Sequence, residues 1–138
     1  MQEGGGGEGN VVVMDADTVR AMLMRNLGHG AEDPVSSHDM YADDAVLEFP
    51  QSGERFEGVV NFREWRSLYP GSVAFDIGRI RGADDIWVAE LTVSYEGSTP
   101  NYGVDVLEIS DGKIARETIY LAVPFDPPEW RAEWRAAP

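Results

Sequence analysis

Two carboxylic acids, Asp105 and Glu117, have the residue type and the spacing for proton-transfer chemistry. They lie on either side of a Ser-Asp-Gly segment between two runs of β-forming residues, so a hairpin should bring them together. A three-residue loop with Gly112 in the left-handed conformation pairs Ile109 with Lys113 and sets Asp105 opposite Glu117. Two acids about 5 Å apart in an apolar setting cannot both ionise at low energetic cost, so the pKa of one of them rises. The pair can then act as a general acid and a general base.

The hairpin turn decides whether this chemistry is available, because side chains alternate between the two faces of a strand. A two-residue turn at Asp111 and Gly112 would instead pair Asp105 with Thr118 and turn Glu117 to the other face. A purely structural role is a further alternative, in which Glu117 forms an ion pair with an arginine. The sequence offers three candidates for that ion pair: Arg79, Arg81 and Arg116.

Other polar residues offer weaker candidates for chemistry. His29 lies in a glycine-containing loop and His38 on a short helix, where exposure or capping explains them better than catalysis does. The acidic pairs at positions 43–44 and 84–85 stand at a strand start and at a turn. Aspartate in such places hydrogen-bonds backbone amides, so these pairs are interpreted as turns rather than as calcium ligands.

Composition restricts the classes of protein and of partner. A chain of 138 residues is one domain, and 11 Lys and Arg against 25 Asp and Glu give a net charge of −14. Nucleic acid and anionic membrane surfaces are therefore not expected as partners. With no Cys and two His, we expect no metal site and no cofactor. No apolar run approaches about 20 residues and no leader segment is recognisable, so we expect a soluble, cytoplasmic protein.

The elements that position the two acids follow from composition and hydrophobic periodicity. We expect a flexible Gly-rich segment over residues 1–14, a folded domain over 15–124 and a tail over 125–138. Capping residues and helical spacing predict three helices, over Asp17–Leu27, Pro34–Met40 and Val59–Tyr69.

Strands complete the predicted domain. The segment AVLEF before Pro50 predicts one strand, and the segment RFEG allows a short partner strand. After Gly71 four longer segments with two-residue periodicity are separated by short turns, which indicates an antiparallel meander. The apolar face of this sheet needs a cover, and the helices supply it. The fold class is therefore α+β, with three N-terminal helices packed on the concave face of a curved antiparallel sheet.

Two segments, YADDAVLEFP and DGKIARETIYL, carry a resemblance to a known family. Together with the order of elements, they resemble the nuclear transport factor two-like superfamily, which contains the SnoaL-like polyketide cyclases and the ketosteroid isomerases. The resemblance covers roughly residues 18–123. It implies a cone-shaped half barrel whose open end admits a small, mostly apolar ligand, and whose outer sheet face commonly forms a homodimer. It also implies that Asp105 lies on the concave face.

The resemblance to ketosteroid isomerases is incomplete position by position. That family has a proton-shuttling Asp directly before the Pro of the first strand, where this chain has Phe49. The family's oxyanion-binding Tyr on the first helix is replaced by Met22, Met24 or Arg25. Only Asp105 matches, as the second oxyanion donor. Steroid isomerisation by that mechanism is therefore not expected.

Two functions of different classes remain. One is a cofactor-independent acid/base enzyme of the isomerase, cyclase or hydrolase type, with Asp105 and Glu117 acting on a lipophilic small molecule. The other is a non-catalytic module of the same fold that binds an apolar ligand or dimerises. The expected ligand pocket is apolar and aromatic. Its expected lining residues are Phe49, Trp65, Tyr69, Trp87, Leu91, Tyr95, Ile119 and Leu121.

The sheet and the tail indicate contacts between subunits. Strand alternation predicts an exposed apolar patch on the convex face, which favours a homodimer. The residues expected there are Tyr102, Val104, Val106, Ile114, Thr118 and Tyr120. In the tail, Asp126 is a possible helix cap, and Trp130 and Trp134 lie on one side of the short helix that follows. They are expected to fix the tail to the body or to a partner subunit; gating of the pocket is the alternative.

Overall fold

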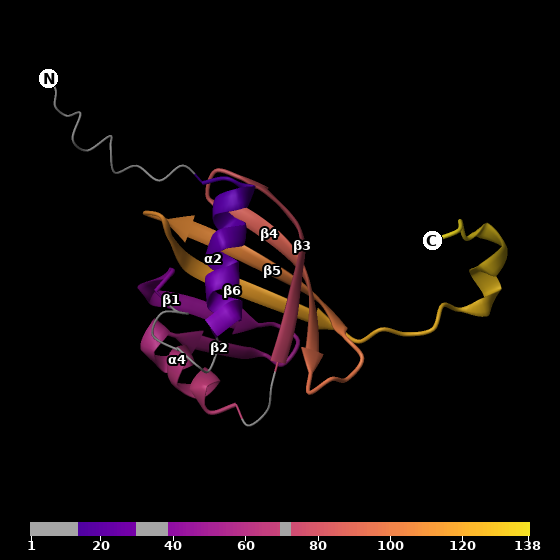
Figure 1. Ribbon diagram of the computed structural model, residues 1–138, viewed down its shortest axis with the longest axis horizontal. Coiled ribbons are helices and arrows are strands. Elements are labelled where there is room, and N and C mark those ends of the chain that lie inside the picture. The colour runs from indigo at the N-terminus through magenta and orange to yellow at the C-terminus, as the bar shows by residue number, and fades with distance from the viewer. Residues whose placement is uncertain (1–13, 30–38, 70–72) are drawn as a thin grey trace, which may run out of the picture.

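A computed structural model describes residues 14–29, 39–69 and 73–138, and shows a curved six-stranded sheet with two helices on its inner face (Figure 1). In chain order the elements are α2 (Ala16–His29), β1 (Tyr41–Phe49), β2 (Glu54–Glu57), α4 (Val59–Ser67), β3 (Val73–Ala83), β4 (Ile86–Tyr95), β5 (Asn101–Ser110), β6 (Lys113–Ala122) and the 3₁₀ helix η2 (Glu129–Trp134). None of the described helices is long and apolar enough to cross a membrane.

The strand order is β2-β1-β6-β5-β4-β3. The last four strands form the predicted antiparallel meander, and β1 pairs antiparallel with β2. Strand β1 also runs parallel to β6, so the first strand of the domain lies beside the last one. The sheet curves without closing into a barrel, and this confirms the predicted α+β class.

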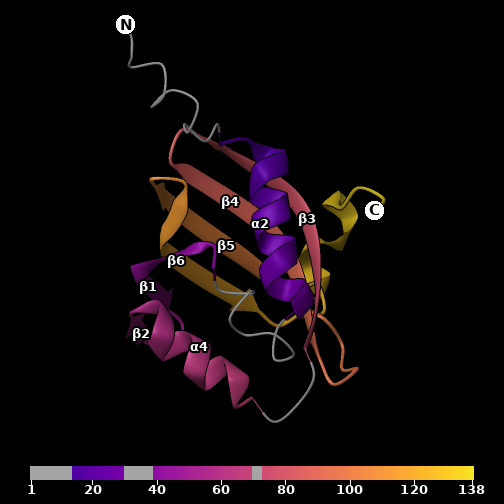
Figure 2. The same cartoon turned by 60° about the vertical axis from the view of Figure 1, so that its left-hand side comes forward.

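Helices α2 and α4 cover the concave face of the sheet (Figure 2). Asp15 caps α2 as its position predicts, because its Oδ1 accepts a hydrogen bond from the Thr18 N–H at 2.8 Å. Val19 and Leu23 of α2 and Phe62 of α4 are fully buried against the sheet. The alternating residues of β4 confirm the predicted inner face, since four of them are buried: Trp87, Ala89, Leu91 and Val93.

The predicted helices are confirmed over α2 and α4, with ends that differ by one or two residues. Most of the helix expected over Pro34–Met40 lies outside the described residues. Its last two residues, Asp39 and Met40, are described and form a turn before β1. His38 also lies outside the described residues. His29 is the last residue of α2 and not part of a loop, which corrects the sequence interpretation.

The hairpin between β5 and β6 contains the two-residue turn, not the three-residue loop favoured by the sequence. Asp111 and Gly112 both have positive φ, 52° and 75°, and the turn pairs Ser110 with Lys113. A β-bulge follows: Ile109 faces Ile114, whereas the next pair is Glu108 and Arg116. The bulge inserts one residue into β6 and so changes which face every later side chain of that strand occupies.

This bulge keeps Glu117 on the predicted inner face and corrects two other predictions, the direct pairing of Asp105 with Glu117 and the outward direction of Ile114. Glu117 lies opposite Leu107 and is buried, although the two-residue turn alone would have turned it outward. Asp105 lies opposite Ile119 and is therefore a diagonal neighbour of Glu117, not its direct partner. Ile114 is fully buried and does not belong to the convex face, because it precedes the bulge.

Candidate active site

Asp105 on β5 and Glu117 on β6 are the two buried charged or polar residues of the part of the chain that the structure describes. Asp105 is 3% exposed and Glu117 is 1% exposed. Both point to the concave face, which the apolar side chains of the core otherwise fill. A buried carboxyl group is costly unless it is hydrogen-bonded, paired with a cation or neutralised by a proton, so the surroundings of these two acids decide their state.

Glu117 is held by one tyrosine and one arginine. The Tyr41 hydroxyl donates a hydrogen bond to Glu117 Oε1. Arg66 Nη2 lies 3.8 Å from the same oxygen, and Arg66 Nη1 donates to the Tyr41 hydroxyl at 3.2 Å. Tyr41 stands at the start of β1 and Arg66 near the end of α4, so β1, β6 and α4 meet at this acid.

The arginines that the sequence suggested as partners of Glu117 are engaged elsewhere. Arg79 and Arg81 both bind Glu90, at 3.2 and 2.6 Å, on the outer face of the sheet. Arg116 binds Glu48 at 2.6 Å. All three lie at alternating positions that point away from the core, so none of them reaches Glu117.

Aromatic rings hold the Arg66 guanidinium in place. Its carbon lies 5.9 Å from the ring centroid of Tyr41 and 5.6 Å from that of Phe62, within the range of a cation–π contact. The Trp65 ring is also 5.6 Å away. Sequence reasoning missed both Arg66 and Tyr41. Their signals were the position of Arg66 one turn after Phe62 on the buried side of α4, and Tyr41 as the first residue of the YADDAVLEFP segment.

Burial raises the pKa of Asp105 well above its ordinary value. The charge of Glu117 and a hydrogen bond with that side chain raise it further, whereas the positive charge of Arg66 acts in the opposite direction. Burial likewise raises the pKa of Tyr41, which keeps its hydroxyl protonated as a donor. Burial and the charge of Glu117 therefore favour the protonated form of Asp105, and Glu117 lies beside Arg66.

One side-chain oxygen of Asp105 is fully enclosed by the fold. Oδ1 is buried and has no hydrogen-bond partner among the described residues. A buried carbonyl or carboxyl oxygen without a partner costs about 1–3 kcal/mol. In a native fold such an atom requires an explanation, and one explanation is a bond to a substrate.

An aromatic pocket of about 800 Å³ lies between the β1–β2 hairpin, α4 and the end of β6. Phe49, Phe56 and Trp65 form its apolar wall, with ring centroids 5.0 to 6.2 Å apart. The remaining lining residues are Gln51, Ser52, Glu54, Asn61 and Leu121. Three residues of the predicted ligand pocket therefore line this one: Phe49, Trp65 and Leu121. Trp65 connects it to the acid network, because its ring contacts Arg66.

The other predicted pocket residues lie elsewhere. Trp87 and Leu91 are buried in the core, and Ile119 packs against it. Tyr69 and Tyr95 contact each other with ring centroids 6.3 Å apart, and Tyr69 is 42% exposed.

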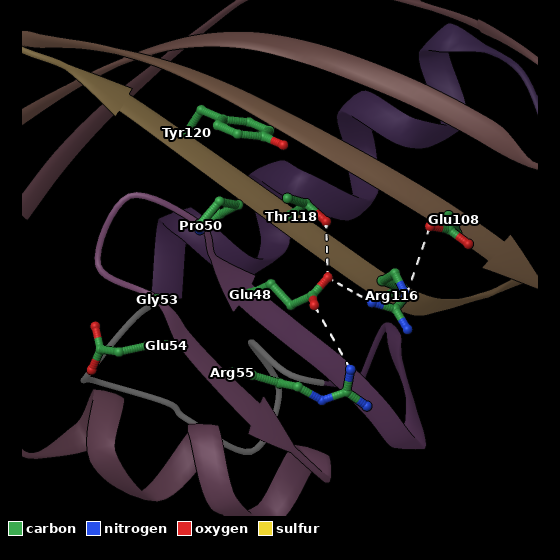
Figure 3. Close-up of a pocket in the computed structure, with 9 residues that line it drawn as sticks. All are labelled: Glu48, Pro50, Gly53, Glu54, Arg55, Glu108, Arg116, Thr118 and Tyr120. Atoms are coloured by element: carbon green, nitrogen blue, oxygen red, sulfur yellow. Dashed lines mark hydrogen bonds and ion pairs between the residues drawn. The ribbon is translucent and has the colours of Figure 1, made fainter.

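A second pocket, of about 600 Å³, lies on the outer face of the sheet (Figure 3). Glu48 is at its centre: it accepts hydrogen bonds from Arg116 at 2.6 Å and Thr118 at 3.5 Å, and lies 3.8 Å from Arg55. Arg116 also lies 3.8 Å from Glu108. These mutually paired charges suit a protein surface better than a catalytic centre.

Within the described residues, no three His, Cys, Asp or Glu side chains gather as a metal site. The paired acids at 43–44 lie within β1, and Asp84 adopts a positive φ of 55° in the turn between β3 and β4.

The sequence profile of the SnoaL-like domain matches residues 19–117 of this chain. The chain belongs to the SnoaL-like family. No curated protein matches its sequence. An NTF-2 like protein of unknown function from Burkholderia xenovorans LB400 is 38% identical, with a TM-score of 0.76 over 88% of this chain and 95% of that one. The predicted relationship to the nuclear transport factor two-like superfamily is thereby confirmed.

More distant structures share the fold of this SnoaL-like protein. A proposed ketosteroid isomerase from Kribbella flavida DSM 17836 is 21% identical, with a TM-score of 0.76 over 91% of this chain and 93% of that one. An LEH-like epoxide hydrolase of M. tuberculosis is also 21% identical, with a TM-score of 0.63 over 77% of this chain and 84% of that one. At this level of identity the likeness concerns the fold alone.

Proposed function

We propose that this SnoaL-like protein is a cofactor-independent acid/base enzyme that moves a proton on a lipophilic, carbonyl-bearing small molecule. One observation carries the proposal: a buried Asp105, whose Oδ1 has no hydrogen-bond partner among the residues that the structure describes, is hydrogen-bonded to a second buried acid, Glu117, which Arg66 and Tyr41 hold in place. Fold relatives named as isomerases, cyclases and an epoxide hydrolase support the same general class.

The Asp105–Glu117 pair can act as a base without a charged atom facing the substrate. A proton leaving the substrate bonds to Asp105 Oδ1, while the proton that Asp105 shares with Glu117 passes to that carboxylate. Reversal of the two transfers returns a proton to a different atom of the substrate, which is the net change in an isomerisation. Arg66 and Tyr41 keep Glu117 in one orientation and counter its charge before the reaction.

The aromatic pocket is the proposed place for the apolar part of the substrate. Its wall of Phe49, Phe56 and Trp65 offers a flat, apolar surface, and Trp65 lies against Arg66 of the acid network. The indole Nε1 of Trp65 is buried without a hydrogen-bond partner among the described residues, so it can donate to a substrate oxygen.

Proton transfer can be tested without knowledge of the natural substrate. Cyclic ketones and enones would be incubated with the protein in D₂O, and exchange of the hydrogens next to the carbonyl followed by NMR. We expect the wild type to accelerate exchange and Asp105→Asn to lose the acceleration by at least about 100-fold, the usual contribution of a general acid or base. Asp76→Asn, an exposed acid on the outer strand β3, is the matched control and should retain the activity. Equal rates in Asp105→Asn and the wild type would contradict the proposal.

A non-catalytic ligand-binding module is the second candidate. It is favoured by the separation of the aromatic pocket from the two acids, neither of which lines it. An aromatic probe such as 1-naphthol would then bind the wild type and Asp105→Asn equally in calorimetric titrations. Phe56→Ala should weaken that binding because it removes one wall of the pocket. Binding without any exchange activity would favour this candidate.

A further inference from the structure

The C-terminal arm (residues 123–138) exposes large apolar side chains that the other described residues do not cover. Phe125 is 80% exposed, Trp130 74% and Trp134 71%. Both tryptophans belong to η2, which stands well away from the sheet after the chain leaves β6 (Figure 1). Three large aromatic rings left in water are unusual for an isolated chain and mark a surface that binds another molecule.

The connection between β6 and η2 holds the arm away from its own sheet. Residues 123–128 include Pro124, Pro127 and Pro128, and no turn interrupts them. A proline-rich segment of this kind is extended by roughly 3.1 Å per residue, so η2 lies about 19 Å of chain beyond the sheet. Proline also restricts the backbone before binding, which lowers the entropic cost of holding the arm in one position.

A complementary surface exists on the same chain. The outer-face patch consists of Tyr102, Val104 and Tyr120, which are 60%, 38% and 45% exposed on β5 and β6. Tyr120 also lines the 600 Å³ pocket on this face, together with Pro50 (Figure 3). The patch and the arm are thus two apolar surfaces without a partner, and the extended connection keeps them apart in one copy.

The area of the exposed rings favours a second copy of the chain as the partner. A buried aromatic side chain contributes roughly 150–250 Å², so the three exposed rings offer on the order of 450 Å² per arm. This is about half of the roughly 800 Å² per partner that a stable interface needs, and the outer-face patch of the other copy can supply the rest. Arg131 and Arg135 accompany the tryptophans, but the arm also carries Asp126, Glu129 and Glu133, so the contact is driven by apolar area and not by net charge.

We propose that two copies of this chain exchange their C-terminal arms, each placing a tryptophan of η2 against Tyr120 in the outer pocket of the other. The contact is reciprocal, so it closes as a symmetric dimer and doubles the area of a single arm. Tryptophan, tyrosine and arginine are the residue types that dominate the binding energy of protein interfaces, and this contact brings all three together.

Sedimentation velocity of the full-length protein tests the exchange. We expect a dimer for the wild type, and a dimer dissociation constant at least about 30-fold higher for Trp130→Ser/Trp134→Ser and for Tyr120→Asp. Val60→Ser, at a 63% exposed position on α4, is the matched control and should leave the dimer unchanged. A monomeric wild type at about 100 µM, or a dimer that the arm variant does not weaken, would overturn the proposal.

Mixing the two variants separates exchange from simple apolar association. The tryptophan variant keeps an intact outer face and Tyr120→Asp keeps an intact arm, so the mixture can form one of the two contacts. We expect a heterodimer that is weaker than the wild-type dimer and stronger than either variant alone. Tryptophan emission should also shift to shorter wavelength with rising protein concentration. A shift that is independent of concentration would show that the arm folds onto its own chain, and would overturn the proposal.

Discussion

At Asp105 two opposing effects decide the charge of the side chain. Burial and the neighbouring Glu117 disfavour the carboxylate, and Arg66 favours it, with a net rise in the pKa of Asp105. Arg66 lies 3.8 Å from Glu117, so the positive charge of Arg66 acts mainly on the Glu117 side chain. The two acids therefore differ in surroundings although both are buried: burial and Glu117 favour a proton on Asp105, and Glu117 lies beside Arg66.

Replacement of each acid by its amide should have opposite consequences for stability. The folded-state pKa of Asp105 lies above the unfolded value of about 4, so its stabilising contribution is complete below that pH. It is lost as the pH rises through the folded-state pKa. Asp105→Asn cannot ionise, so its free energy of unfolding relative to the wild type should increase as the pH rises from about 4 through the folded-state pKa of Asp105.

Glu117→Gln is the contrasting variant. It keeps an amide oxygen that can accept from Tyr41 but removes the negative charge that pairs with Arg66, and should cost about 3 kcal/mol at neutral pH. Urea unfolding of both variants at several pH values measures the two effects. An equal loss of stability in both at pH 7 would show that the acids serve only as structural partners.

Removal of the Tyr41 hydroxyl should change both the stability of the protein and the pH profile of its activity. Tyr41→Phe keeps the ring contact with Phe62, at a centroid distance of 5.1 Å, and removes the hydroxyl that links Arg66 to Glu117. We expect a loss of about 1–3 kcal/mol in unfolding experiments and a shift in the pH profile of the exchange activity. Retention of the wild-type pH profile would mean that the hydroxyl has no part in orienting Glu117.

The residues of the site could be predicted in part from the sequence. Asp105 and Glu117 were identified because the Ser-Asp-Gly turn places them on adjacent strands and because the resemblance to the ketosteroid isomerases matches Asp105. Tyr41 and Arg66 were missed because their contacts depend on the parallel pairing of β1 with β6 and on the angle at which α4 crosses the sheet. Neither of these is a local property of the sequence.

At the scale of the elements, local patterns predicted most of the sheet. Alternating residues and short turns indicated β3 to β6, and the buried set on β4 confirms that alternation. The bulge in β6 was not predictable, because the Asp111–Gly112 turn is compatible with either register. Burial of Ile114 and Glu117 selects the register that the structure shows.

Close contact between β3 and β4 should make Gly82 irreplaceable. A Cβ atom there would lie 2.2 Å from the carbonyl oxygen of Ile86 and 2.8 Å from Trp87 Cα, and both are backbone atoms that cannot move alone. Gly82→Ala should therefore lower the free energy of unfolding by about 2 kcal/mol or more. Gly97→Ala is a useful comparison, because it adopts a φ of +75° in open space and should lose only about 1 kcal/mol. Equal melting temperatures for the two variants would contradict this account of the hairpin.

At the scale of the whole molecule, the net charge of −14 opposes association of two copies. Raising the ionic strength to about 0.5 M shortens the range of this repulsion, so the proposed dimer should become tighter as salt increases. Light scattering at low and high salt measures this change. At high salt the mass should approach twice the 15.2 kDa of the chain. Weaker association at high salt would indicate an interface held chiefly by ion pairs and not by the apolar arm.

The protonation state of Asp105 in the native protein is the most direct test of the proposed site. Carboxyl ¹³C chemical shifts of the folded wild type, compared with those of Asp105→Asn, identify the resonance of this residue and follow its titration. The account predicts one aspartic acid that remains protonated near neutral pH and whose resonance is absent from the variant. If every aspartate resonance instead titrates below about pH 5, Asp105 is an ordinary carboxylate, and the proposed proton transfer between Asp105 and Glu117 is wrong.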